Sequence, residues 1–252
     1  MTSLNRSSQS RLYRPRDIVR NSSLLALLWI AYSAVREVSV SSSAAAFANA
    51  TKVMNVQQTM GMDIEAGVQA ILGFGWLFKI ANWYYLVHFP VTLVALGTAY
   101  MLSRSNLFVR FRNALIGATG IALFLHVQYP LAPPRMLDGY VDSGAVFGPN
   151  PYELAGSDGA NQFAAMPSMH VGWAVLVGLL IWAFSAGSIA RTVAVLHPLI
   201  TSFVVVLTAN HYVLDVIIGG ALAGGIWYLM RGLQQRPLSP IPVTDQDSVS
   251  SG

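Results

Sequence analysis

The stretch NHYVLDV (210–216) places a histidine and an aspartate in an otherwise apolar part of the chain. His211 and Asp215 are four residues apart, so a helix would carry both on one face. An aspartate beside a histidine fixes the tautomer of the ring and raises its basicity. Such a histidine can attack an electrophile or take up a proton. The same pair could instead only tie two helices together, and the spacing alone leaves both interpretations open.

A second polar segment, AMPSMHVGW (165–173), is typical of the start of a helix. Ser168 can cap the first turn, and Pro167 prevents the helix from extending backwards. The free backbone N–H groups of such a helix end bind anions. His170 would lie in the first turn beside the anion, or would be an interface histidine that faces water.

A third segment, HVQYPLAPPRML (126–137), carries an arginine behind two prolines. Arginine binds phosphate in a forked, two-point contact. Arg135 could alternatively be an arginine that touches lipid headgroups. Taken together, the three segments predict a phosphate that is held by Arg135 and a helix N-terminus and flanked by His170 and His211. To the substrate-binding set we add Ser168, Gln128, Tyr212, His126 and His88; the last two could equally be packed helix histidines with backbone partners.

The composition indicates the kind of protein that must position these groups. Only 10% of the residues are charged, against about 25% in ordinary soluble domains. Long apolar runs accompany this deficit, which indicates a polytopic membrane protein. Cysteine is absent, which excludes disulfides, thiolate metal sites and cysteine nucleophiles.

The apolar runs predict an all-α fold, a bundle of six transmembrane helices. The predicted spans are 21–40, 80–102, 114–132, a segment from Val171, 192–209 and 213–230. Residues 48–76 mix polar and apolar positions and are predicted to form an interfacial amphipathic helix. The domain prediction is therefore a cytoplasmic tail (1–21), a membrane catalytic domain (22–235) that includes an outer-face loop (133–166), and a disordered tail (236–252).

The charge distribution predicts the orientation. With the N-terminus inside, six spans place 11 of the 15 Lys and Arg residues on the cytoplasmic side, as the positive-inside rule requires. Both termini would be cytoplasmic, and the three polar segments would meet on the extracytoplasmic face of the cell membrane. The net charge of +4 is thereby explained without a nucleic-acid partner. An alternative for the first apolar run is a signal peptide that is cleaved near AAAFANA.

The three segments resemble motifs of the type-2 phosphatidate phosphatase superfamily. PSMH is similar to its P-S-G-H motif, and HYVLDV matches its H-x-x-x-D motif. HYVLDV is closer still to the H-Y-[TS]-x-D-V motif of sphingomyelin synthases and inositol phosphorylceramide synthases, and YPLAPPR resembles the first motif of the inositolphosphotransferase branch. The resemblance extends from about Ile80 to Met230 and includes a six-span architecture.

The resemblance implies a role for each residue. His211 would be the nucleophile that forms a phosphohistidine, and Asp215 would orient it. His170 would protonate the leaving group and then activate the acceptor, while Arg135 would stabilise charge on the transferring group.

The chain departs from the phosphatase pattern. Gln128 stands in place of a lysine, and Val204 and Val205 stand in place of the Ser-Arg pair of the third motif. A site with one remaining cation suits a monoanion better than a dianion. We therefore predict transfer of a phospho-headgroup from a phosphodiester lipid, such as an inositol phospholipid, to an alcohol or to water.

Two kinds of alternative remain open at this stage. The first is a phosphatase acting on phosphatidate or a polyprenyl phosphate. The second is a different class of protein, either metal-dependent through its histidines and Asp215 or non-catalytic. For a lipid phosphotransferase we predict no metal and no cofactor. The predicted partners of the protein are a phospholipid or lipid-linked phosphate, the acceptor and the membrane.

Overall fold

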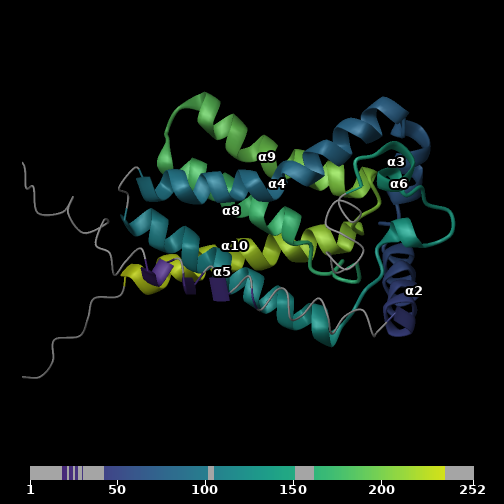
Figure 1. Ribbon diagram of the computed structural model, residues 1–252, viewed down its shortest axis with the longest axis horizontal. Coiled ribbons are helices and arrows are strands. Elements are labelled where there is room, and N and C mark those ends of the chain that lie inside the picture. Colours follow the sequence, from purple (N-terminus) through teal and green to yellow (C-terminus); the bar gives the residue numbers. More distant parts are fainter. Residues whose placement is uncertain are drawn as a thin grey trace, which may run out of the picture.

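A computed structural model describes residues 19–21, 23–24, 26–27, 30, 43–101, 105–150 and 162–235. Five long helices run side by side along its longest axis (Figure 1): α4 (Gly75–Met101), α5 (Ser105–Gln128), α8 (Met169–Phe184), α9 (Ser188–Leu207) and α10 (Val213–Gln235). Helix α8 contacts the other four. Small residues permit this close packing: a Cβ at Gly178 would meet the carbonyl oxygen of Ala194 on α9.

The apolar helices identify an integral membrane protein. Three segments have the length and hydropathy of a complete span: Asn106–Gln128, Ser188–Leu207 and Val213–Leu233. Helix α4 makes a fourth if its halves, Gly75–His88 and Pro90–Tyr100, count as one span with a bend of 40°. Pro90 explains the bend, because proline lacks an N–H and displaces the preceding carbonyl.

Two of the six predicted spans are not complete spans in the described structure. Helix α8 is apolar but has only 16 residues, fewer than a straight span requires. The predicted span 21–40 and the tails fall almost entirely outside the described residues, as does 151–161 of the outer-face loop.

The prediction for the start of α5 was wrong. The apolar run begins at Ala114, whereas the helix begins at Ser105 and includes two arginines. Arg110 is buried: its guanidinium lies 3.9 Å from the ring centre of Trp227 on α10, and its Nε donates to the Trp227 carbonyl at 3.0 Å. A partner on a neighbouring helix, invisible in the local sequence, thus allows the helix to continue through charged residues.

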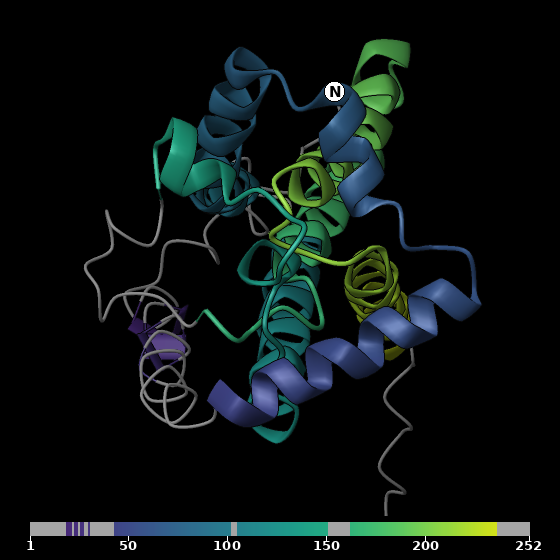
Figure 2. The same cartoon turned by 90° about the vertical axis from the view of Figure 1, so that its right-hand side faces the viewer.

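The predicted interfacial helix at 48–76 is two helices, α2 (Ser43–Thr59) and α3 (Glu65–Leu72). Helix α2 lies across one end of the bundle (Figures 1 and 2). Its buried positions recur every three or four residues and are Ala46, Asn49, Ala50, Val53 and Gln57. The polar residues of this region are therefore not all at an interface: Gln57 and Glu65 are 1% and 0% exposed, inside the protein.

The described parts of the loop between α5 and α8, residues 129–150 and 162–168, are folded against the same end of the bundle. They contain a short 3₁₀ helix, η2 (Pro134–Met136), and helix α6 (Ser143–Phe147). Asn82 on α4 holds α6 by donating to the Ser143 carbonyl and accepting from its hydroxyl, both at 2.9 Å. Leu131 and the segment 163–165 pair through backbone hydrogen bonds, which brings the first and second polar segments together.

Candidate active site

The three polar segments predicted from the sequence meet at the end of the bundle that carries α2, α3 and α6 (Figure 1). The first segment forms η2, the second leads into α8, and the third is the turn between α9 and α10. The Arg135 amide donates to the Ala209 carbonyl at 2.8 Å, and the Ser168 amide donates to the Asp215 carbonyl at 3.1 Å. Backbone hydrogen bonds therefore fix all three segments relative to one another.

The turn that carries His211 is tightly wound. Ala209 has φ of 49°, in the left-handed region that residues other than glycine seldom adopt. The amides of Asn210 and His211 both donate to the Val205 carbonyl, at 3.0 and 3.2 Å. A non-glycine residue in this region costs about 1–3 kcal/mol, and such strain is concentrated at functional sites.

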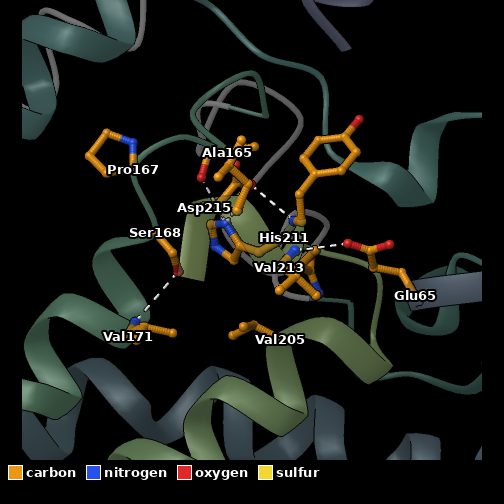
Figure 3. A network of polar contacts seen from close by, with 12 residues as sticks. Glu65, Ala165, Pro167, Ser168, Val171, Val205, His211, Val213 and Asp215 are labelled. Atoms are coloured by element: carbon orange, nitrogen blue, oxygen red, sulfur yellow. Dashed lines mark hydrogen bonds and ion pairs between the residues drawn. The ribbon is translucent and has the colours of Figure 1, made fainter. Parts of the chain in front are cut away.

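The imidazole of His211 is oriented chiefly by a backbone carbonyl (Figure 3). Its Nδ1 lies 2.8 Å from the Ala165 oxygen and 3.5 Å from Asp215 Oδ2. A carbonyl oxygen can only accept a hydrogen bond, so Nδ1 carries the proton and Nε2 keeps its lone pair. This is the tautomer that a nucleophilic Nε2 requires.

Asp215 has two contacts at this site. The carboxylate lies next to His211 as the spacing predicted, but Ala165 is the closer partner of the ring. Asp215 Oδ2 also accepts from the Tyr212 amide at 3.0 Å, which caps the start of α10. The sequence could not reveal the Ala165 contact, because a main-chain carbonyl has no residue-type signal.

His170 lies in the first turn of α8, as predicted. Ser168 is the N-cap residue, and its hydroxyl accepts from the Val171 amide at 3.5 Å. The His170 ring stacks on Tyr85 of α4, with 3.9 Å between ring centres and 22° between planes. Its centre lies 5.9 Å from that of His211, so one bound group could contact both rings.

The two other candidate histidines differ in their surroundings. His126 Nε2 lies 3.2 Å from the Pro167 carbonyl, so this histidine has the backbone partner that a packed helix histidine requires. His88 is buried, with its ring centre 5.5 Å from that of His170. Neither ring nitrogen of His88 has a hydrogen-bond partner in the described part of the chain. A buried polar group of this kind calls for a ligand, a water or a catalytic explanation.

Arg135 is buried, and in the described part of the chain the side chains of Asn210, Asp142 and Gln162 bind it. Its Nε donates to Asn210 Oδ1 at 2.9 Å, and its two terminal nitrogens lie 3.3 Å from Asp142 Oδ2 and 3.4 Å from Gln162 Oε1. The side chain of Arg135 is 4% exposed, whereas that of Asp142 is 32% exposed. The arginine is therefore fixed in place, while one of its partners can be displaced toward solvent.

The remaining predicted binding residues lie in different environments. Gln128 ends α5 with an exposed side chain. Tyr212 is fully buried, and its hydroxyl donates to the Ala132 carbonyl at 2.9 Å. Burial raises the pKa of the Tyr212 phenol well above its usual value, so it stays a neutral donor.

The sequence did not point to five of the side chains that complete this site. Asn210, Asp142 and Gln162 surround Arg135, while Glu65 and Gln57 contact the start of α10. Asn210 adjoins the His211 motif, and Asp142 follows Arg135 at a distance of seven residues. Closeness in sequence to a predicted site residue was therefore the only indication that these two residues belong to the site. Glu65 and Gln57 had none, since about 150 residues separate them from their partners.

The arrangement can support attack on a phosphorus atom. It offers a nucleophilic nitrogen on His211, a proton donor or acceptor on His170, one cation on Arg135 and the N-terminus of α8. Within the described ranges, no three His, Cys, Asp or Glu side chains gather as the ligands of a metal ion would.

Comparison with known families agrees with this geometry. The model of the PAP2 superfamily matches residues 51–229, which is 179 of the 252 residues. The chain therefore belongs to the PAP2 superfamily, which is the type-2 phosphatidate phosphatase superfamily. No curated protein and no solved structure matches the chain. Family membership and apolar helices together fit a membrane enzyme, a lipid phosphatase or phosphotransferase.

Proposed function

We propose that this protein transfers the phospho-headgroup of a phosphodiester lipid to an alcohol, through a phosphohistidine at His211. An inositol phospholipid is the donor that the resemblance to the inositolphosphotransferase branch favours. The observation that carries the proposal is the state of Arg135, the arginine of the first motif, which already shares its charge with Asp142 at 3.3 Å.

The charge of the site is the main argument for a diester. A phosphomonoester carries close to two negative charges at neutral pH, and a diester carries one. Where the phosphatase pattern has further cations, this chain has exposed Gln128 and buried Val204 and Val205. Burying an uncompensated charge costs several kcal/mol. When the substrate displaces Asp142 toward solvent, Arg135 and the N–H groups of α8 balance a monoanion without further cations.

The two histidines divide the chemistry. His211 Nε2 attacks phosphorus, a P–N bond forms, and the bond to the lipid oxygen breaks as His170 gives that oxygen a proton. His170 then removes the proton of the incoming alcohol, whose oxygen attacks phosphorus and releases His211. Water in place of the alcohol gives hydrolysis as a side reaction. His88, whose ring centre lies 5.5 Å from that of His170 and whose nitrogens have no partner among the described residues, would complete the binding surface together with Ser168.

The competing functions make different predictions. A monoester phosphatase would release inorganic phosphate from phosphatidate or a polyprenyl phosphate. A metal-dependent enzyme would lose activity in chelator, which the proposed mechanism tolerates. A non-catalytic protein would work normally with His211→Ala.

The experiment compares donors at equal surface concentration in detergent. Purified protein is expected to consume an inositol phospholipid faster than phosphatidate, and an added long-chain alcohol is expected to capture the headgroup. His211→Ala is the inactive control, and a parallel reaction contains chelator. Rapid phosphate release from monoesters with no turnover of diesters would restore the phosphatase hypothesis.

The proposed active-site face is extracytoplasmic, with cytoplasmic termini, on the evidence of the charge distribution. The lack of natural cysteines makes this easy to test. An impermeant thiol reagent applied to intact cells should label Asp138→Cys, in the exposed loop after η2, and miss Ser188→Cys at the opposite end of the bundle. The reverse pattern would place the site in the cytoplasm.

A further inference from the structure

Three successive backbone amides at the start of α10 are bound by side chains. The Tyr212 amide donates to Asp215 Oδ2 at 3.0 Å, the Val213 amide to Glu65 Oε1 at 2.8 Å, and the Leu214 amide to Gln57 Oε1 at 2.8 Å. Gln57 Nε2 also donates to Glu65 Oε1 at 2.8 Å, which links the two acceptors. Figure 3 shows Glu65 reaching Val213 beside His211.

Two of these acceptors come from helices outside the five-helix bundle. Gln57 lies near the end of α2 and Glu65 begins α3, and both side chains are completely buried. Glu65 Oε2 has no hydrogen-bond partner in the part of the chain that the structure describes. A buried carboxyl group with one unpartnered oxygen is unfavourable for stability, so its retention points to a task at the site.

We propose that Glu65 and Gln57 are positioning residues for His211 and direct the substrate phosphate to α8; this rests on the function proposed above. We call the side chains of Glu65, Gln57 and Asp215, which accept from the three N–H groups, the amide clamp. His211 immediately precedes these amides, so its backbone is fixed on both sides: the Val205 carbonyl accepts from the His211 N–H, and the clamp holds residues 212–214.

The clamp also decides which helix end can bind the phosphate. A helix N-terminus carries partial positive charge and free N–H groups that attract anions. At the start of α10 the N–H groups of residues 212–214 already donate to side chains of the protein, two of them to carboxylates. The N-terminus of α8, with its Ser168 cap and His170, therefore remains the end that receives the anion. A phosphate bound there faces His211 Nε2 instead of competing for the turn that holds it.

The test uses substitutions that separate positioning from general stability. Gln69 is the matched control: it is another buried side chain of α3, and it binds the backbone of Val141 and Leu207 instead of α10. The variants are Glu65→Ala, Glu65→Gln, Gln57→Ala and Gln69→Ala, each in the full chain. The readouts are kcat and KM for the donor that the wild type uses, the thermal midpoint, and the rate at which diethyl pyrocarbonate modifies His211, followed by peptide mass spectrometry.

Loss of the clamp is expected to reduce kcat by about 10–100-fold with KM changed less than about threefold, because a small displacement of a nucleophile has a large effect on rate. Glu65→Gln retains an oxygen that accepts from Val213 and Gln57, so it should recover most of kcat. His211 modification should change severalfold in Glu65→Ala and Gln57→Ala and stay at the wild-type rate in Gln69→Ala.

The proposal is overturned if the clamp variants lower the thermal midpoint but keep wild-type kcat and wild-type His211 modification, as Gln69→Ala should. If Glu65→Ala does not fold, Gln57→Ala provides the comparison with Gln69→Ala. The modification rate needs no substrate. If the protein has no phosphotransfer activity, the proposed function is wrong. The rate at which diethyl pyrocarbonate modifies His211 would still decide whether the clamp positions His211.

Discussion

Two buried arginines, Arg135 and Arg110, show how the two ends of the bundle differ. Arg110, in the half of α5 remote from the site, lies on the ring of Trp227 and donates to its backbone carbonyl. Arg135, at the site end, is bound by the side chains of Asn210, Asp142 and Gln162. One arginine thus joins two helices, and the other holds polar side chains that a substrate would replace under the proposed function.

These two arginines show how burial is to be interpreted in this protein. A buried charge is not by itself a sign of function, since both arginines are buried to the same degree. The nature of the partner is the informative feature. The partners of Arg110 are a carbonyl and a ring that cannot leave, whereas the carboxylate of Asp142 is one-third exposed and can turn away.

The largest difference in kcat/KM is expected between the variants in which Arg135 or Arg110 is replaced by lysine. Arg135→Lys should reduce kcat/KM by about 100-fold or more, because it removes a preorganised, forked contact to the transferring group. Arg110→Lys should leave the kcat/KM of the folded protein within about threefold and lower only the thermal midpoint. Parallel kinetics and unfolding curves on both variants check this, and equal kinetic losses would show that the two ends do not differ in this way.

A smaller effect is expected from adding one methyl group to α10. A Cβ at Gly219 would collide with the backbone carbonyl of Ser168, so Gly219→Ala should push α8 from α10 and destabilise the protein by about 1–3 kcal/mol. Activity should fall with it, by about tenfold, because Ser168 and Asp215 are joined across this contact. Gly224→Ala, on the same helix, meets nothing within 4 Å and should retain both activity and stability. Unfolding in detergent and initial rates distinguish the two variants.

The smallest effect concerns specificity. Asp142→Asn removes the charge that pairs with Arg135 but keeps an oxygen that can cap α6 through the Ala145 amide. The site then has one more net positive charge, so the ratio of monoester to diester turnover should rise by about 3–10-fold. Competition between phosphatidate and an inositol phospholipid measures this ratio. An unchanged ratio would mean that the charge of Arg135 does not select the substrate.

The sequence predicted the parts of this molecule whose signals are local. Apolar runs located α4, α9 and α10 within a few residues, and the serine before His170 identified the N-cap of α8. The pairing of His211 with Asp215 was predicted correctly, but for the wrong reason: His211 lies in the turn before α10, and only Asp215 is on the helix. Each of these features depends on residues close together in the chain, where periodicity and residue type are informative.

Contacts between distant segments could not be predicted in this way. The tautomer of His211 depends on the Ala165 carbonyl, and the start of α5 depends on Trp227 more than a hundred residues later. Residues 48–76 gave a polar pattern that predicted an interfacial helix, yet Gln57 and Glu65 turn inward to the start of α10. The sequence shows that these two residues are polar, but it does not show that the buried amides of Val213 and Leu214 are their hydrogen-bond partners.

The covalent intermediate on His211 is the most direct test of the account. Purified protein is mixed with a phosphodiester lipid labelled at phosphorus, quenched within one turnover in alkali, digested and examined by mass spectrometry. We expect a headgroup phosphate on the peptide that contains His211, stable in alkali, lost in acid, released when an alcohol acceptor is added, and absent from His211→Asn. Label on His170 instead, or full headgroup transfer by His211→Asn, would contradict it.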